Sequence, residues 1–481
     1  MNNIKLLDIA NKNVVRIQCE NIIQNIMIPY QKISKGTSFG SGFFISKNHI
    51  LTNHHVIEYA MNIYINIPNI GKKQFPAKLA CYSIENDYAI LEIQNYNNTN
   101  KLFKIGNSHK IQAGEKLKVC GFPLGNINPN LKIVDGVVSG WERNKIQHDT
   151  NTNPGMSGGV ILNSKNEAIG IHIGVISGKG WTNTAYAIPI KVININNRIN
   201  MIKHNKNYPI IIKNPIFGFK TQISHNELIK SIIINKKHIK DGMGIVVTNI
   251  FSKFKTQMKS GDILFKVKDH LVDNYKDILF SCNKENKITY EYLTNYNDTD
   301  DKYEIIFYSK KLNKILKEKH EFKDKSYYFT HEISDINFLN EKIAYVNYGG
   351  ILVTKLSNSH FSIFNEANQS NIVYKLLKYK NKSKLQDCKT DANNNNVLIV
   401  THIYPSTSIY TNKIITVGSI IKKVNHKNVY TLTDYIKELK NSKKYAIITL
   451  DNNKIDIIDM ENVDKLNIFL AQQYNYPLIK Y

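Results

Sequence analysis

The sequence has few cysteines, and their positions argue against a disulfide framework and against a zinc site. The chain of 481 residues has five, odd in number and scattered, without C-x-x-C spacing or histidines at metal-ligand spacing: Cys19, Cys81, Cys120, Cys282 and Cys388. Disulfide-stabilised folds and structural zinc sites need cysteines at close, paired spacing. The pattern therefore favours a reducing compartment and predicts no metal.

A long apolar stretch is also missing. No uninterrupted apolar run approaches the roughly 18 residues that a membrane span needs. Residues 1–5, Met-Asn-Asn-Ile-Lys, do not begin an apolar signal-peptide core. We therefore expect no membrane span, and a location in the cytoplasm or nucleus, or in a virus particle if the source is viral.

Acidic residues are in short supply, since 64 Lys and Arg face 39 Asp and Glu, which gives a net charge of +25. Such an excess can attract nucleic acid or other acidic surfaces. However, the basic residues are spread along the chain without a recognisable nucleic-acid module, and Lys, Asn, Ile and Tyr are all abundant, as in proteins from AT-rich genomes. A bias of composition explains the charge better than a nucleic-acid partner.

The most informative segment is residues 153–159, Asn-Pro-Gly-Met-Ser-Gly-Gly, in which glycines flank Ser157. Two segments precede it: residues 51–56 contain His55, and residues 87–91 begin with Asp87. A serine hydroxyl becomes a nucleophile when an imidazole accepts its proton, and a carboxylate orients that imidazole. The chain order His, Asp, Ser is that of chymotrypsin, whereas subtilisins and α/β-hydrolases use other orders.

These segments, and several around them, resemble the Deg/HtrA-type serine proteases, with the plant-type eukaryotic branch as the nearest match. The matching motifs are Gly-Ser-Gly-Phe-Phe at 40–44, Thr-Asn-His-His-Val at 52–56, Asp-Tyr-Ala-Ile-Leu at 87–91, Gly-Phe-Pro-Leu-Gly at 121–125 and Ala-Tyr-Ala-Ile-Pro at 185–189. Alignment to the motif makes His55 the catalytic base, with His54 in a variable slot. The resemblance implies a catalytic triad of His55, Asp87 and Ser157.

The resemblance also implies the residues around the triad. Backbone N–H groups of Gly155, Met156 and Ser157 would form the oxyanion hole, where each donor typically lowers the barrier by about 3–4 kcal/mol. Met156 departs from the family, which usually has Asn there, so we expect Met156→Asn to raise kcat. Residues of the substrate pocket would be Thr152, Ile171, His172 and Ile173. Thr152 replaces a usual apolar residue, and this small wall still favours small or medium aliphatic P1 residues.

The fold class follows from many short strand candidates separated by Gly, Pro, Asn or Asp, at residues 61–67, 75–83, 88–93, 116–121, 131–138 and 168–175. Such spacing indicates a sandwich or a barrel. The resemblance selects a mainly β protein: a chymotrypsin-like double β-barrel followed by two α+β PDZ-like domains. We expect a protease domain at 1–205, ending in a helix at 192–204, and PDZ-like domains at 206–325 and 326–481.

The first PDZ-like domain carries a candidate peptide site. Phe217, Gly218 and Phe219 resemble the loop with which PDZ domains capture a peptide C-terminus through backbone N–H groups and an open sheet edge. The Gly-Asp-Ile-Leu turn at 261–264 supports this register. The segments 348–353 and 417–425 resemble parts of the second, divergent PDZ-like domain.

The resemblance as a whole implies an ATP-independent serine endopeptidase that cleaves unfolded or damaged proteins, works as a homo-oligomer built on a trimer, and needs no cofactor. One alternative is an inactive scaffold that binds peptides, which only Met156 supports. A basic structural protein that binds nucleic acid is the other. Covalent labelling of Ser157 separates enzyme from scaffold, and the salt dependence of binding tests the nucleic-acid alternative.

Overall fold

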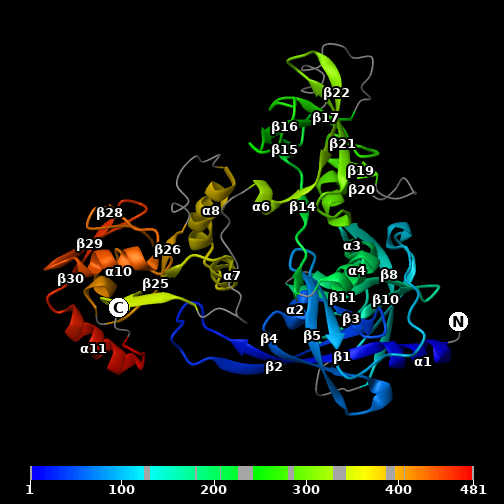
Figure 1. The fold of residues 1–481 in the computed structure, drawn as a ribbon, viewed down its shortest axis with the longest axis horizontal. Helices are drawn as coiled ribbons and strands as arrows, with labels where there is room; N and C mark the ends of the chain where they lie inside the picture. The colour runs from blue at the N-terminus through cyan, green and yellow to red at the C-terminus, as the bar shows by residue number, and fades with distance from the viewer. Residues whose placement is uncertain are drawn as a thin grey trace. The chain divides into compact units, whose positions relative to one another are not determined.

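The computed structural model describes residues 3–123, 130–178, 181–205, 207, 209–225, 242–279, 287–328, 343–385, 396–405 and 407–478 (Figure 1). The chain divides into two compact units. Unit 1 comprises residues 1–21 and 37–328, and unit 2 comprises residues 22–36 and 329–481. Among the described residues, no helix is long and apolar enough to cross a membrane.

Unit 1 begins with helix α1 (Asn3–Asn13), which the sequence analysis did not predict, and then forms a six-stranded barrel. The barrel has the order β5-β4-β1-β2-β3-β6 and closes because β6 also pairs with β5. Its strands are β1 (Val14–Ile23), β2 (Ser34–Phe44), β3 (His49–Thr52), β4 (Ala60–Asn66), β5 (Gln74–Ser83) and β6 (Tyr88–Ile93). Ile17, Phe44 and Leu91 are among the side chains that fill it. The short elements α2 (His54–Ile57) and η1 (Pro68–Ile70) connect its strands.

A second closed barrel of six strands follows, in the order β10-β11-β12-β9-β8-β7. Its strands are β7 (Lys116–Gly121), β8 (Lys132–Glu142), β9 (Lys145–His148), β10 (Val160–Asn163), β11 (Ala168–Gly178) and β12 (Trp181–Pro189), with η2 (Ser108–Lys110) before them. Val119, Ile146 and Met156 belong to its buried interior. The two barrels confirm the predicted chymotrypsin-like architecture.

Helices α3 (Ile190–Ile193) and α4 (Ile195–His204) leave the second barrel, where the sequence predicted one helix at 192–204. Asn194 separates them because its backbone is left-handed, with φ of 50°. The short strand β13 (Ile210–Ile211) then pairs in parallel with β5.

The rest of unit 1 contains a sheet with the order β15-β16-β17-β21-β22, with β15 at its edge. The elements of this part are β14 (Pro215–Ile216), β15 (Phe219–Gln222), β16 (Ile245–Ile250), β17 (Ile263–Val267), β18 (His270–Leu271), β19 (Asp277–Leu279), β20 (Lys287–Thr289), η4 (Tyr290–Tyr296), β21 (Lys302–Ser309), β22 (Lys314–Glu321), β23 (Lys323–Asp324) and α6 (Lys325–Tyr328). The predicted Gly-Asp-Ile-Leu turn leads into β17, and Gly261 there has φ of 92°.

Unit 2 is an α+β unit whose sheet has the order β24-β25-β26-β27-β29-β30, with β28 on β27. Its elements are β24 (Tyr345–Tyr348), β25 (Ile351–Lys355), α7 (Asn358–Glu366), α8 (Ser370–Leu385), β26 (Leu398–Ile403), α9 (Ser408–Asn412), β27 (Ile420–Val424), β28 (Lys427–Asn428), α10 (Leu432–Lys440), β29 (Tyr445–Leu450), β30 (Ile455–Asp459) and α11 (Val463–Tyr474). Gly349 and Gly350 make the two-residue turn between β24 and β25, and both have positive φ, as such turns require. The boundaries at 205 and 325 stay predictions.

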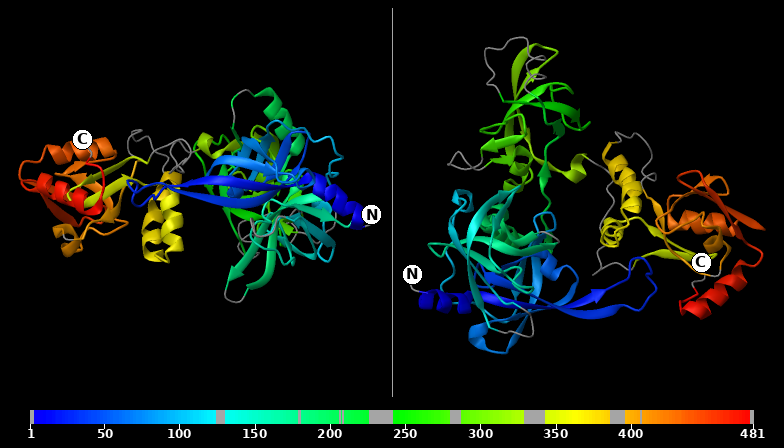
Figure 2. Two further views of the ribbon diagram at one scale, coloured as in Figure 1. Left: turned by 90° about the horizontal axis from the view of Figure 1, so that it is seen from below. Right: turned by 180° about the vertical axis from the view of Figure 1, so that it is seen from behind.

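Unit 2 also contains a segment from far earlier in the sequence. Strands β1 and β2 run side by side as a long ribbon (Figure 2), and residues 22–36 at its end belong to unit 2. The ring of Tyr30 lies 5.2 Å from that of Tyr476 and 6.3 Å from that of Tyr345, and Met27 packs against a cluster that includes Leu356. The core of unit 2 therefore includes side chains from the start of the chain.

Candidate active site

The structure brings His55 and Asp87 together. Nδ1 of His55 lies 2.8 Å from Oδ2 of Asp87, and the backbone N–H of His55 donates to Oδ1 at 2.9 Å. Because a carboxylate accepts hydrogen bonds, Nδ1 carries the proton, and Nε2 is left to accept one from a nucleophile. His54 instead stacks on Tyr82 at 5.2 Å. The predicted choice of His55 over His54 agrees with this geometry.

The turn that carries Asp87 is held from several sides. Asp87 has φ of 51°, and its carbonyl accepts a hydrogen bond from the Asn53 amide at 3.1 Å. Asn86 exchanges side-chain hydrogen bonds with Asn214, at 2.6 and 3.2 Å. The hydroxyl of Tyr88 accepts a hydrogen bond from Arg198 at 3.2 Å. The carboxylate is therefore presented by a turn with little freedom.

Arg198 is buried on α4, with 5% of its surface exposed, and it also pairs with Asp298. Asn197 donates to the same carboxylate at 2.7 Å. A buried charge needs a partner of opposite charge and full hydrogen bonding. Asp298 supplies both from the segment that precedes β21.

Ser157 lies on the loop between β9 and β10. Its hydroxyl donates to the backbone carbonyl of Ile173 at 2.7 Å, and the described residues show no hydrogen bond between Ser157 and His55. A hydroxyl has one hydrogen, so it must rotate about its Cα–Cβ bond before the imidazole can take the proton.

Ser41 anchors this loop to the first barrel, a role that the sequence analysis missed. Its hydroxyl donates to the carbonyl of Gly155 at 2.8 Å, and its N–H donates to the carbonyl of Ser157 at 2.8 Å. The same hydroxyl accepts the N–H of Phe122 at 2.9 Å. The Gly-Ser-Gly motif at 40–42 was the available signal, because a polar residue between glycines permits such close backbone contact.

The three residues predicted for the oxyanion hole do not behave alike. Gly155 has φ of 98°, and its N–H and that of Ser157 donate to no other described residue. The N–H of Met156 donates to the carbonyl of Asn153 at 3.2 Å, and its side chain is buried, with 1% exposed. Gly155 and Ser157 thus remain as donors for an oxyanion, whereas Met156 is occupied.

Gly158 illustrates why the loop needs glycine. A Cβ there would lie 2.0 Å from the carbonyl oxygen of Ser41 and 2.3 Å from Oγ1 of Thr52. Gly158 also has φ of 86°. Any other residue would therefore separate the loop from the first barrel.

The predicted pocket residues divide into two groups. Ile171 is fully buried in the core and pairs with Val160 and Ile188. Thr152 and His172 form a hydrogen bond of 2.8 Å between Oγ1 and Nε2, and Ile173 offers its carbonyl to Ser157. Thr152, His172 and Ile173 thus make hydrogen bonds around the serine loop, whereas Ile171 packs in the core, and the pocket stays a prediction.

A second buried histidine accompanies His172. Nδ1 of His148 lies 2.8 Å from the Thr150 hydroxyl, and the two imidazole rings are 5.4 Å apart. Burial lowers the pKa of His172 to about 3 and that of His148 to about 4. Both rings are therefore neutral at neutral pH. His148 was not predicted to belong to the site, because its hydrogen bond to Thr150 is apparent only in the folded loop.

Phe217, Gly218 and Phe219 lie in the interior. Phe217 and Phe219 are 5% and 4% exposed, and a Cβ on Gly218 would lie 2.2 Å from the ring of Phe254. Strand β15, which begins at Phe219, is at the sheet edge, as a peptide site requires. Residues 226–241, which follow β15, lie outside the described residues. The peptide-binding role stays a prediction.

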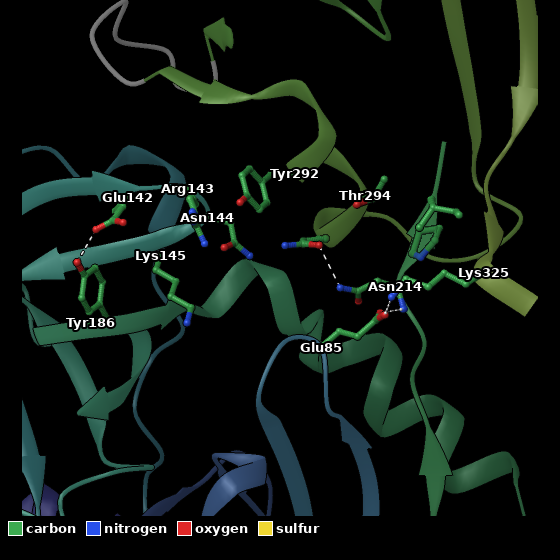
Figure 3. Close-up of a pocket in the computed structure, with 13 residues that line it drawn as sticks. Glu85, Glu142, Arg143, Asn144, Lys145, Tyr186, Asn214, Tyr292, Thr294 and Lys325 are labelled. Carbon is green, nitrogen blue, oxygen red and sulfur yellow. Dashed lines mark hydrogen bonds and ion pairs between the residues drawn. The ribbon is translucent and has the colours of Figure 1, made fainter. Parts of the chain in front are cut away.

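A separate cavity of about 610 Å³ contains none of the predicted catalytic residues (Figure 3). The ion pair of Lys325 with Glu85 lies at one side, and Tyr186 donates a hydrogen bond to Glu142 at the other. The lining thus mixes both charges with hydrogen-bonded groups.

Two closed barrels, with a His-Asp pair and a glycine-flanked serine on their loops, define a trypsin-like peptidase domain. Residues 40–171 match the family described as "Trypsin-like peptidase domain". Relatives of the chain include Deg/HtrA serine proteases, which confirms the predicted resemblance.

One relative is "Protease Do-like 2, chloroplastic" of Arabidopsis thaliana, 27% identical over 190 residues, which cover 37% of this chain and 31% of that protein. "Periplasmic pH-dependent serine endoprotease DegQ" of Escherichia coli is 34% identical over 174 residues, 34% of this chain and 37% of that protein. The chain thus spans about a third of the length of these relatives. The solved structure "HtrA-type protease AlgW with tripeptide" has the same fold, with a TM-score of 0.50 and 19% identity, and covers 67% of this chain and 97% of its own.

These relatives overturn the predicted location. They are named as chloroplastic or periplasmic proteases and point to a periplasmic or organellar compartment. The cytoplasmic or nuclear prediction is therefore wrong. That prediction depended on the cysteine pattern and on the first residues. Neither observation determines the compartment, because a protein without disulfides can also fold in an oxidising compartment. The three described cysteines, Cys19, Cys81 and Cys120, are free and buried.

Proposed function

We propose that this chain is a serine endopeptidase that cleaves unfolded or damaged proteins without ATP. The observation that carries the proposal is the His55–Asp87 pair, joined by two hydrogen bonds, on the barrel that Ser41 links to the loop of Ser157. Relatives named as serine endoproteases support the peptidase part of this proposal.

In the proposed reaction, Nε2 of His55 takes the proton of Ser157 as Oγ attacks the substrate carbonyl. Asp87 stabilises the resulting imidazolium. The N–H groups of Gly155 and Ser157 stabilise the oxyanion, since neither has a competing acceptor among the described residues. His55 then returns the proton to the leaving amine. A water molecule, deprotonated by His55, then attacks the acyl-enzyme, which releases the acyl fragment as a carboxylic acid and restores the Ser157 hydroxyl. Water, side chains and backbone supply these steps, so the proposed mechanism uses no cofactor.

In this proposal, substrate binding brings the Ser157 hydroxyl into line with Nε2 of His55. The Ser157 hydroxyl is turned to Ile173, so the resting site is not yet arranged for attack. A substrate strand beside Ile173 competes for that region and releases the hydroxyl toward His55. We also propose that the chain works as a homo-oligomer, as the resemblance implies.

The same hydrogen bond favours the rival function, an inactive scaffold that binds peptides. Reaction with a fluorophosphonate decides between the two, because only an activated serine displaces the fluoride and keeps the phosphonyl group on Oγ. We expect one label per chain, at Ser157, found by mass spectrometry. Ser157→Ala should abolish labelling, whereas Ser139→Ala, at an exposed serine of β8, should not. A wild-type chain that is neither labelled nor able to cleave unfolded casein would overturn the peptidase.

A further inference from the structure

The wall beside Ser157 is polar. The backbone of His172 exchanges hydrogen bonds with the serine loop, donating to Gly159 at 2.8 Å and accepting from Gly158 at 2.9 Å. Thr152 lies five residues before Ser157 on the same loop, and its hydroxyl is bonded to the His172 ring. The two side chains are therefore placed where the substrate side chain next to the attacked carbonyl must lie.

Space for that side chain exists at Gly174. Its φ is 148°, and a Cβ there would have one heavy atom within 4 Å, Oγ of Ser157 at 3.8 Å. Because Gly174 has no side chain, the space beside Oγ of Ser157 is not filled at this position. Thr152 and His172, which are 9% and 1% exposed, lie deeper.

The polar wall is not a requirement of packing. Nδ1 of His172 is buried and has no hydrogen-bond partner among the described residues. An unsatisfied buried polar atom typically costs about 1–3 kcal/mol, and a pocket for aliphatic side chains would need no such atom. A buried imidazole with a spare polar atom is therefore better explained by recognition of a substrate.

The protonation state indicates what is recognised. Burial, with His148 and His55 nearby, lowers the pKa of His172 to about 3, so the ring is neutral. In the tautomer with a proton on Nε2, this N–H donates to Oγ1 of Thr152, so the Thr152 hydroxyl keeps its own hydrogen as an uncharged donor. A neutral donor suits a carbonyl oxygen, whereas a carboxylate would need a compensating charge that this wall does not carry.

We propose that Thr152 and His172 form the specificity-determining wall of the primary substrate pocket and select a P1 side chain with a neutral amide, that of glutamine. This inference rests on the proposed peptidase function. It replaces the expectation of small or medium aliphatic P1 residues, because Thr152 was then considered without its hydrogen bond to His172.

The test uses the full chain and internally quenched peptides that differ only at P1, with Gln, Glu, Met or Val. Met matches Gln in length but lacks the amide. We expect kcat/KM for Gln to exceed that for Met and Val by roughly 10- to 100-fold, because the aliphatic side chains leave the Thr152 hydroxyl unpaired. Cleavage sites in denatured casein, read by mass spectrometry, should show the same preference. A preference for Val would overturn the proposal, and so would a preference for Glu.

Matched variants assign the preference to this wall. Thr152→Val keeps the shape but removes the hydroxyl, and we expect the Gln-to-Val ratio of kcat/KM to fall roughly 10-fold. Thr150→Val makes the same change at the hydroxyl that holds His148, and the Gln preference should remain. An unchanged ratio in Thr152→Val would reject the wall.

The fluorophosphonate label separates the two proposals. A chain that labels at Ser157 but cleaves all four peptides equally keeps the peptidase function and loses this inference. A chain that neither labels nor cleaves any of the four peptides loses both.

Discussion

Two histidines near the candidate nucleophile make hydrogen bonds of equal length in opposite environments. His55 lies 2.8 Å from a carboxylate oxygen, and its side chain is 40% exposed. His172 lies 2.8 Å from the Thr152 hydroxyl and is 1% exposed. A charged ring is compensated by Asp87 in the first case, whereas in the second the interior resists charge and lowers the pKa to about 3. The hydrogen-bond partner and the access of solvent, and not the length of the hydrogen bond, decide which ring can carry a positive charge.

This comparison fits the proposed roles, proton transfer for His55 and neutral recognition for His172. Of the three predictions that follow, the first and the last test these two roles, and the one with the largest expected effect comes first.

Removal of the paired imidazole should abolish peptidase activity. We expect His55→Ala to lower kcat on unfolded casein by about a million-fold, like Ser157→Ala, and the double variant to be scarcely worse, because the two groups act as a unit. The measurement is casein hydrolysis followed by fluorescence. His54→Ala is the matched control, since His54 stacks on Tyr82, and it should stay active. Equal losses in both histidine variants would contradict the assignment.

A polar side chain without a partner should not be tolerated in the interior of the second barrel. Met156 is 1% exposed and packs against hydrocarbon, including Val119 and Ile161. Met156→Asn should therefore cost about 2–4 kcal/mol of the free energy of unfolding and lower kcat, which reverses the expectation from the sequence. Met156→Leu should cost less than about 1.5 kcal/mol. Urea unfolding measures both, and a stable, faster Met156→Asn enzyme would restore the original expectation.

The buried pair should make stability depend on pH. Unfolded histidine has a pKa of about 6.5, whereas the folded pKa is about 3 for His172 and about 4 for His148. The unfolded chain then binds more protons below pH 6.5, so stability is complete above that pH and is lost as the pH falls toward the folded values. Each ring should contribute about 2 kcal/mol of loss by pH 5.

Other groups titrate in the same range, so the readout is the difference between two chains. Urea unfolding followed by the fluorescence of Trp141, which lies on β8, should show a shallower pH slope in His172→Gln than in the wild type. The expected difference is about 1.4 kcal/mol per pH unit near pH 5. Parallel slopes would show that His172 is protonated in the fold.

Features of the fold and site that depend on short segments could be predicted from the sequence. Strands β6 and β7 have the predicted bounds, because turn residues delimit both segments. His55, Asp87 and Ser157 were found because each lies in a motif whose backbone demands particular residues. Their roles remain predictions, since the structure shows Ser157 bonded to Ile173 and not to His55.

Contacts between distant segments were beyond the sequence. The hydrogen bond of Thr152 to His172 joins residues 20 positions apart and is buried, so no local pattern in the sequence indicates it. Phe217 and Phe219 matched a peptide-binding pattern, yet both pack in the interior. The same apolar residue can lie in a binding loop or in a core, and only the packing seen in the structure distinguishes the two.

The segment 22–36 has a consequence for how the chain is made. Because unit 2 is discontinuous, no single cut separates the two units, and a fragment that begins at 329 lacks part of its own core. During synthesis, Tyr30 leaves the ribosome 446 residues before Tyr476, the ring it will contact. At a translation rate of about 5–20 residues per second, the segment 22–36 is exposed for on the order of 20–90 s before Tyr476 is made. Residues 22–36, near the start of the chain, therefore cannot complete their packing until the last residues of the chain have been made.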